Sequence, residues 1–287
     1  MTKAKKENSI IGALVDNPTI NKAYFWLSQK GFFKDVREFY RDARASRILG
    51  RIKQRPVPEH IAIIMDGNRR WAKKMGLDAN EGHAVGRDIL EQVLDWWEDI
   101  GSKVLTVYAF STENLKRSSE EVNFLLSKMA EELNRLVEEP RIHKTRTRVK
   151  VIGDLSLLTE DVRKAAARLT ERTKNYSDRS FNLAIGYGGR QEIINGIKKL
   201  AEDVKEGKID SSKINEELFS KYLYTGELPD PNLIIRTSGE ERISNFLLWQ
   251  AAYSELYFTD VYWPEFSKRQ FMRAIEEYQL RKRRYGT

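Results

Sequence analysis

The chain alternates between short apolar runs and longer amphipathic segments, and this alternation limits how it can fold more than any other feature. A short apolar run bounded by turn-forming residues is typical of a strand buried on both faces, and apolar residues near a 3.6-residue spacing are typical of a helix. The runs predict strands at 61–65, 104–110, 149–152, 180–187, 233–236 and 256–258. The amphipathic segments predict helices at 86–99, 120–138, 159–175 and 191–204. We therefore predict an α/β fold with a mostly parallel central sheet flanked by helices.

The composition narrows the class of protein further. With 287 residues, of which 40% are hydrophobic and 32% charged, the chain can bury a substantial core. No apolar run approaches the roughly 20 residues that cross a bilayer, and the N-terminus lacks the apolar core of a signal peptide. Cysteine is absent from the sequence, which excludes disulfides and cysteine-ligated zinc. We expect a cytoplasmic protein.

Residues 1–55 form a basic, aromatic-containing arm that ends at Pro56-Val57-Pro58. The whole net charge of +8 falls within this arm, and the rest of the chain is close to neutral. The arm predicts a helix at 35–48, which fits either peripheral contact with an anionic membrane or packing on the body of the protein. A nucleic-acid enzyme usually spreads positive charge over its main body, so we expect no nucleic-acid partner for residues 56–287.

Polar clusters follow four of the predicted strands, and open α/β sheets bind ligands at the carboxyl ends of their strands. Arginine occurs in each cluster, and the four clusters are residues 66–70, 111–117, 187–190 and 236–245. Together they predict a pocket for more than one phosphate group. Asp66, at the end of the first strand, is a candidate ligand for a metal bound to a phosphate. Taken alone, residues 66–70 also fit a surface turn with two solvated arginines.

A series of motifs in this order resembles the cis-prenyltransferases, the undecaprenyl and dehydrodolichyl diphosphate synthases, over about residues 57–285. The motifs are M-D-G-N-R-R-W-A, G-H, A-F-S-T-E-N, Y-G-G-R, I-R-T-S-G-E-x-R-I-S-N-F-L-L-W-Q and S-E-L-Y-F-T-D-V-Y-W-P-E-F. The R-R form of the first motif is more typical of archaeal or eukaryotic members. The resemblance implies that residues 56–287 are a catalytic domain whose sheet and helices enclose an apolar product tunnel.

The resemblance also implies the reaction. An allylic diphosphate, farnesyl or geranylgeranyl, binds with Mg²⁺, and the double bond of isopentenyl diphosphate attacks its C1. Proton loss leaves a cis double bond, and repeated cycles make a long-chain polyprenyl diphosphate, the precursor of a dolichol-type glycosyl carrier lipid. The candidate walls of the tunnel are the helices at 86–99 and 120–138, with Leu90, Phe124, Leu125 and Met129 as lining, although ordinary core packing gives these residues the same spacing.

The resemblance assigns roles to individual residues. It assigns catalytic roles to Asp66 and Asn114. It assigns binding of the Mg²⁺ ion to Asp66 and Glu255. It gives substrate binding to Gly67, Asn68, Arg69, Arg70, Trp71, His83, Ser111, Thr112, Glu113, Arg117, Arg236, Arg242 and Ser244. Because an amide is a weak base, the departing diphosphate is favoured over Asn114 as the proton acceptor. His83 also fits a helix-packing role, and Glu255 also fits an ion pair at a dimer interface.

One position departs from the family pattern, because Ala79 stands where many relatives have an arginine that holds the allylic diphosphate. Arg69, Lys73 or Lys74 would then substitute for it, or the diphosphate is held differently. The segment 243–266 resembles the region through which the family forms homodimers. Two alternatives remain, a non-catalytic regulatory partner of an active subunit and an enzyme that uses an acceptor other than isopentenyl diphosphate. The first is disfavoured because the D-G-N motif is intact.

Overall fold

The computed structural model describes residues 47–281, which divide into two compact units. The larger unit comprises residues 58–91 and 101–266, and the described part of the smaller one comprises 47–57, 92–100 and 267–281. Within the described residues, no helix has both the length and the apolar character needed to cross a membrane. The predicted helix at 35–48 lies almost entirely outside these residues.

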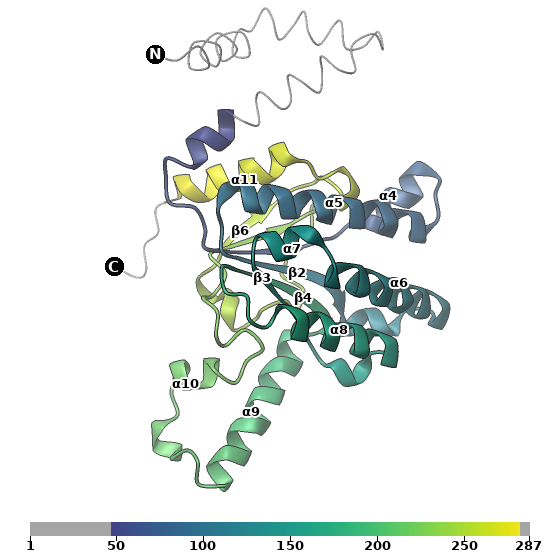
Figure 1. The fold of residues 1–287 in the computed structure, drawn as a ribbon. Helices are drawn as coiled ribbons and strands as arrows, with labels where there is room; N and C mark the ends of the chain where they lie inside the picture. The colour runs from purple at the N-terminus through teal and green to yellow at the C-terminus, as the bar shows by residue number, and fades with distance from the viewer. Residues whose placement is uncertain (1–46, 282–287) are drawn as a thin grey trace, which may run out of the picture. The chain divides into compact units, whose positions relative to one another are not determined.

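A six-stranded sheet in the order β3-β4-β2-β1-β5-β6 forms the centre of the larger unit, and every neighbouring pair is parallel (Figure 1). The strands are β1 (His60–Ile64), β2 (Val104–Ser111), β3 (Thr147–Ile152), β4 (Arg179–Tyr187), β5 (Leu233–Arg236) and β6 (Glu255–Phe258). All six match predicted strands to within about two residues. The prediction of a mostly parallel sheet in an α/β fold is therefore confirmed.

Strand β1 lies between β2 and β5, and all five of its residues are buried, as a continuous apolar run predicts. Ile64 pairs with Tyr108 of β2 on one side and with Arg236 of β5 on the other. After β1 the chain continues toward β2, whereas after β5 it continues toward β6. Strands β1 and β5 therefore flank a topological switch point, where open α/β sheets form ligand crevices.

The helices of the larger unit are α4 (Asn68–Met75), α6 (Ser119–Val137), α7 (Pro140–Lys144), α8 (Glu160–Thr173), α9 (Gly189–Lys205) and α10 (Glu216–Ser220). Helices α7 and α8 contact β3 and α6 packs against α8, whereas α9 and α10 project away from the sheet (Figure 1). Helix α5 (Ala79–Ile100) begins in the larger unit and ends in the smaller one. It starts seven residues before its predicted start at residue 86.

The smaller unit combines the end of α5, a helix at 47–52 and α11 (Lys268–Leu280). A capping box between Ser267 and Gln270 begins α11. The rings of Trp96 and Phe271 lie 6.1 Å apart between α5 and α11, and Lys268 Nζ lies 2.6 Å from Asp99 Oδ2. Both aromatic side chains are buried, so the unit has an apolar core of its own.

A buried polar chain crosses the sheet from β1 to β4. His60 Nδ1 lies 2.7 Å from the Pro229 carbonyl, His60 Nε2 lies 2.8 Å from Thr106 Oγ1, and Asn182 Nδ2 donates to Thr106 Oγ1 at 3.0 Å. A carbonyl only accepts, so His60 Nδ1 carries the proton and Nε2 accepts from the threonine hydroxyl. Burial lowers the pKa of His60 to about 4, although the bond to Pro229 acts in the opposite direction.

We expect His60 to make folding pH-dependent. Between about pH 6.5 and pH 4 the unfolded chain binds a proton at this histidine and the folded chain does not, so stability falls as the pH falls, by about 3 kcal/mol in total. Urea denaturation at pH 7 and pH 4.5 measures the loss. His60→Gln should reduce it, whereas His143→Gln, on the half-buried α7 histidine, should leave the loss intact. Equal pH dependence in wild type and His60→Gln would contradict this assignment.

Candidate active site

Asp66 is held at the switch point by hydrogen bonds to its backbone. Its N–H donates to Thr237 Oγ1 at 3.0 Å, and the threonine hydroxyl donates to the Asp66 carbonyl at 2.6 Å. Gly67 follows with φ 107°, a conformation that favours glycine, and a Cβ there would lie 2.7 Å from Tyr262 Cδ1. The turn from β1 into α4 is therefore fixed in a conformation that aims the Asp66 carboxylate toward β5.

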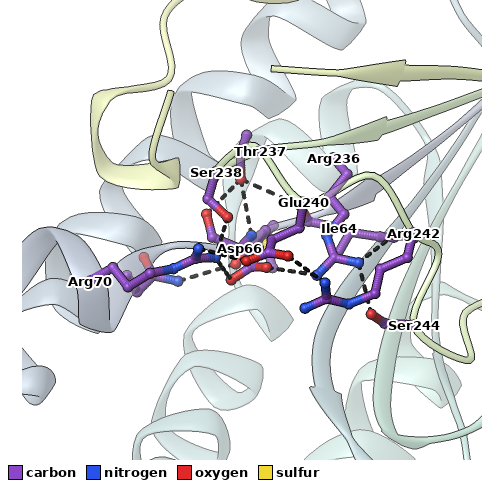
Figure 2. Close-up of polar contacts among 11 residues, drawn as sticks. Ile64, Asp66, Arg70, Arg236, Thr237, Ser238, Glu240, Arg242 and Ser244 are labelled. Carbon is purple, nitrogen blue, oxygen red and sulfur yellow. Dashed lines mark hydrogen bonds and ion pairs between the residues drawn. The ribbon is translucent and has the colours of Figure 1, made fainter. Parts of the chain in front are cut away.

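Two arginines from distant parts of the chain hold the Asp66 carboxylate (Figure 2). Asp66 Oδ2 accepts from Arg236 Nη2 at 2.8 Å, and Asp66 Oδ1 lies 3.2 Å from Arg70 Nη2. The Arg236 side chain is only 4% exposed. Its Nη1 donates to Ser244 Oγ at 2.7 Å and also to the Arg242 carbonyl. A buried guanidinium with three acceptors has a fixed orientation.

Glu240 binds the guanidinium groups of Arg70 and Arg242 (Figure 2). Its Oε1 accepts from Arg70 Nη1 at 2.9 Å, and its Oε2 accepts from Arg242 Nη1. We call Asp66, Arg70, Arg236, Glu240 and Arg242 the arginine–carboxylate cluster. It combines α4, the end of β1, the end of β5 and the loop after β5, so the structure brings together two of the four predicted polar clusters.

The Asp66 carboxylate is ionised and suited to a divalent cation. Burial alone would raise the pKa of Asp66, but hydrogen bonding and charge from Arg236, with those of Arg70, lower it below its usual value. Each oxygen accepts from one guanidinium and keeps a lone pair, and 29% of the side chain is exposed. No three His, Asp or Glu side chains among residues 47–281 form a metal cage. A single hard carboxylate fits Mg²⁺, which is commonly bound with waters and substrate phosphates.

Two glycines let the start of α5 approach the first turn of α4 closely. A Cβ on Gly82 would lie 2.4 Å from the Asn68 carbonyl oxygen, and a Cβ on Gly86 would lie 2.2 Å from Asn68 Oδ1. Asn68 Nδ2 donates to the Met65 carbonyl at 3.2 Å, but its buried Oδ1 has no partner among the described residues. The side-chain amide of Asn68 is therefore fixed beside the predicted diphosphate cradle.

Replacing Gly86 by alanine should destabilise the protein by roughly 2 kcal/mol, because the new methyl group overlaps Asn68 and lies 2.9 Å from Trp263 Cδ1. The expected sign is the reverse of the usual effect of Gly→Ala within a helix. Gly50→Ala is the matched control, since Gly50 also lies in a helix and a Cβ there meets nothing within 4 Å. Urea denaturation measures both variants, and a stable Gly86→Ala would show that α4 and α5 can separate freely.

Arg69 points away from Arg70, toward α6. Arg69 Nε lies 3.7 Å from Glu121 Oε1, which also accepts from Arg117 Nη1 at 2.9 Å. His83 lies beside this group, and its buried Nε2 has no partner among the described residues. Burial, then Arg117 and Arg69, lower the pKa of His83 to about 4 against the opposing charge of Glu121. His83 is therefore neutral near pH 7. Arg69 and Arg70 therefore bind different groups of residues.

The loop after β2 is closed by a capping box. Ser111 N–H donates to Asn114 Oδ1 at 3.0 Å, and Asn114 N–H donates to Ser111 Oγ at 3.2 Å. The amide oxygen of Asn114 thus accepts a hydrogen bond within its own loop. Asn245 Nδ2 donates to Glu113 Oε1 at 3.0 Å, and the Arg190 N–H donates to Asn245 Oδ1 at 2.9 Å. Asn245 therefore connects the loop after β5 with the segment after β2 and with the first turn of α9.

Glu255 lies at the other end of the sheet from Asp66. It pairs with Leu233 at the start of β5, whereas Asp66 follows Ile64, which pairs with Arg236 at the end of β5. One chain therefore does not bring these two carboxylates together. Trp71 is half-buried on α4, and Ala79 is the first residue of α5. Lys74 Nζ lies 3.6 Å from Glu265 Oε1, a contact about as long as that of Arg69 with Glu121.

Sequence reasoning gave no role to Thr237 and Glu240, although both occur in the quoted T-S-G-E segment. Thr237 fixes the Asp66 backbone, and Glu240 joins Arg70 to Arg242. A polar residue directly after a buried strand was the available signal for Thr237. Glu240 gave no such signal, because an acidic residue in a loop usually faces solvent.

Comparisons with known proteins show the family of the chain. The family model for undecaprenyl diphosphate synthases (Prenyltransf) matches residues 64–286. A tritrans,polycis-undecaprenyl-diphosphate synthase (geranylgeranyl-diphosphate specific) from Picrophilus torridus is 54% identical over 252 residues, 88% of this chain and 99% of that protein. An enzyme of the same name from Methanopyrus kandleri is 55% identical over 236 residues, 82% of this chain and 87% of that protein.

The fold is also that of a solved prenyl diphosphate synthase. Lavandulyl diphosphate synthase from Lavandula x intermedia, crystallised with dimethylallyl diphosphate, superimposes with a TM-score of 0.77 at 35% identity, over 80% of this chain and 99% of that one. The chain therefore belongs to the undecaprenyl diphosphate synthase family, the cis-prenyltransferases. It is a prenyl-transferring enzyme with archaeal relatives, and the resemblance drawn from its motifs is confirmed.

Proposed function

We propose that the enzyme condenses isopentenyl diphosphate with geranylgeranyl diphosphate, with Mg²⁺, to make a long-chain polyprenyl diphosphate. The observation that carries this proposal is the Asp66 carboxylate held between Arg70 and Arg236 at the β1/β5 switch point. An ionised carboxylate beside arginines suits a metal-bound diphosphate. The printed names of the Picrophilus torridus and Methanopyrus kandleri relatives support geranylgeranyl diphosphate as the allylic primer.

Different residues would bind each of the two substrates. Arg70, with the first turn of α4 and neutral His83, would hold the allylic diphosphate. Arg236, Arg242 and Ser244 would hold the diphosphate of isopentenyl diphosphate. Arg69 or Lys74 would supply the positive charge that Ala79 lacks, because more than half of each side chain is exposed and their contacts with Glu121 and Glu265 are long. Asn114 would position the reacting carbons through the loop it closes.

In the reaction, the bond between C1 and the diphosphate oxygen breaks as C1 bonds to the terminal alkene carbon of isopentenyl diphosphate. This bond leaves a cation at C3 of isopentenyl diphosphate. A proton then leaves C2, beside that cation, to form the new double bond, and the departing diphosphate accepts the proton. Asp66 would hold Mg²⁺, which supplies positive charge for the leaving diphosphate. The guanidinium groups of Arg70 and Arg236 would stabilise the same developing charge from fixed positions.

The test is incorporation of labelled isopentenyl diphosphate into butanol-extractable product with Mg²⁺, using geranylgeranyl or farnesyl diphosphate as primer. We expect product with geranylgeranyl diphosphate and a lower rate with farnesyl diphosphate. Chromatography of the product gives its chain length, which the apolar tunnel would limit. Of the proposed lining residues, Leu125 is buried, and Leu90, Phe124 and Met129 are half-buried. Failure with both primers would favour the regulatory-partner alternative.

We further propose a homodimer, in which Glu255 of one chain reaches the Asp66 site of the other. Support comes from the position of Glu255 on the edge strand β6, at the opposite end of the sheet from Asp66 of its own chain. Light scattering checks the assembly state. A monomer with full activity would exclude this arrangement.

We also propose that residues 1–55 contact membranes that carry the apolar product. The support is the basic and aromatic composition of this arm. In a flotation assay, the intact chain should bind anionic liposomes, and the chain without residues 1–50 should not. Neutral liposomes should bind neither of the two chains. Unchanged flotation of the shortened chain would refute the arm's role.

A further inference from the structure

The arginine–carboxylate cluster contains a carboxylate that the proposed reaction does not use. Three guanidinium groups face two carboxylates, Asp66 and Glu240 (Figure 2). Asp66 has the proposed task of holding Mg²⁺. Glu240 has no such task, yet its two oxygens bind two arginines that belong to different proposed substrate subsites, Arg70 and Arg242.

A carboxylate bound to an arginine occupies the same N–H donors that a phosphate oxygen would use. Arg70 Nη1 is taken by Glu240 at 2.9 Å, and its Nη2 is shared between Asp66 at 3.2 Å and Ser238 Oγ at 2.5 Å. A diphosphate that approaches Nη1 and Nη2 of Arg70 therefore competes with Glu240 and Asp66 for these two nitrogens. The same holds for the Arg242 Nη1 that binds Glu240.

Glu240 is the carboxylate that would leave. Asp66 is fixed by both Thr237 bonds and by the Trp263 N–H that donates to its carbonyl at 3.0 Å, and its partner Arg236 is buried. The arginines that bind Glu240 are exposed, with 42% of the Arg70 side chain and 62% of the Arg242 side chain accessible. Exposed ion pairs are weak, whereas separating a buried pair is costly.

We infer that Glu240 is an internal counter-anion that binds Arg70 and Arg242 when the diphosphate subsites are empty and is displaced when a diphosphate binds. This inference rests on the proposed function, because it takes these arginines as diphosphate ligands. Glu240 then opposes diphosphate binding and favours its release. It lowers affinity for the released diphosphate, which would otherwise occupy the site between cycles.

The experiment is calorimetric titration of the full chain with inorganic pyrophosphate, once without metal and once with Mg²⁺. Glu240→Gln should bind pyrophosphate about five- to tenfold more tightly than wild type in both titrations, since the competing charge is removed and the side chain keeps its size. Glu241→Gln is the matched control, because it removes the same charge from the neighbouring exposed residue. Its affinity should stay within twofold of wild type.

The other outcomes separate the inference from the proposed function. Unchanged or weaker metal-free binding by Glu240→Gln, with normal binding by wild type, would overturn the inference alone. Weaker binding of Glu240→Gln with Mg²⁺ would assign Glu240 to the metal and overturn it as well. Equal tightening by both variants would show a general charge effect, which also overturns it. No binding by wild type or either variant would reject the proposed diphosphate site together with the inference.

Discussion

Asp66→Asn is expected to lower the rate of isopentenyl diphosphate incorporation by about a thousandfold at saturating substrate. The amide keeps the size of the side chain but loses the negative charge that would hold Mg²⁺. It also replaces one oxygen that accepts from an arginine by an NH₂ group, which cannot accept. Turnover in the labelled-substrate assay measures the change.

The control for this prediction is folding, because Arg236 is buried against Asp66. Thermal unfolding should show that Asp66→Asn is folded at the assay temperature, and Glu241→Gln should have wild-type activity. A folded Asp66→Asn with more than a tenth of wild-type turnover would remove Asp66 from the proposed metal site.

Arg236→Lys should reduce kcat/KM for isopentenyl diphosphate by 10- to 100-fold, mainly through a higher KM. A hydrogen bond to a charged group contributes about 1.5–3 kcal/mol, and lysine cannot bridge Asp66 and Ser244 in one plane as the guanidinium does. Initial rates at varied isopentenyl diphosphate measure the effect, with the allylic primer held saturating.

Arg242→Lys is the matched comparison, because Arg242 is exposed and its side chain binds Glu240 alone among the described residues. Its kcat/KM should fall less than about fivefold, as exposed pairs contribute little. If both substitutions had the same effect, the buried geometry of Arg236 would have no special part in binding.

The strands could be predicted from the sequence because most of them are short apolar runs buried on both faces. The start of α5 could not, because residues 79–85 carry few apolar side chains and Gly82 and Gly86 lower helix propensity. Those glycines are there for the close approach to Asn68. Helix α11 was not predicted, although Ser267 and Gln270 form a recognisable capping box.

The sequence could predict which loops form the site at one edge of the sheet, but it could not predict which side chains contact one another there. Its motifs indicated Asp66, Arg70 and Arg236 together, since parallel strands place their carboxyl ends at one edge. Arg69 and Arg70 point in different directions because consecutive residues of a helix are rotated by about 100° around its axis. The distance between Glu255 and Asp66 depends on strand register, which the resemblance alone did not provide.

The strand order also has a consequence for synthesis of the chain on the ribosome. Strand β1 is made early, but its neighbour β5 contains Arg236, which follows Asp66 by 170 residues. Until then, one edge of this mainly apolar central strand has no partner, and unpaired apolar edges promote aggregation. A nascent chain stalled before β5 should therefore require a chaperone, and it should gain protease resistance only after β5 has emerged.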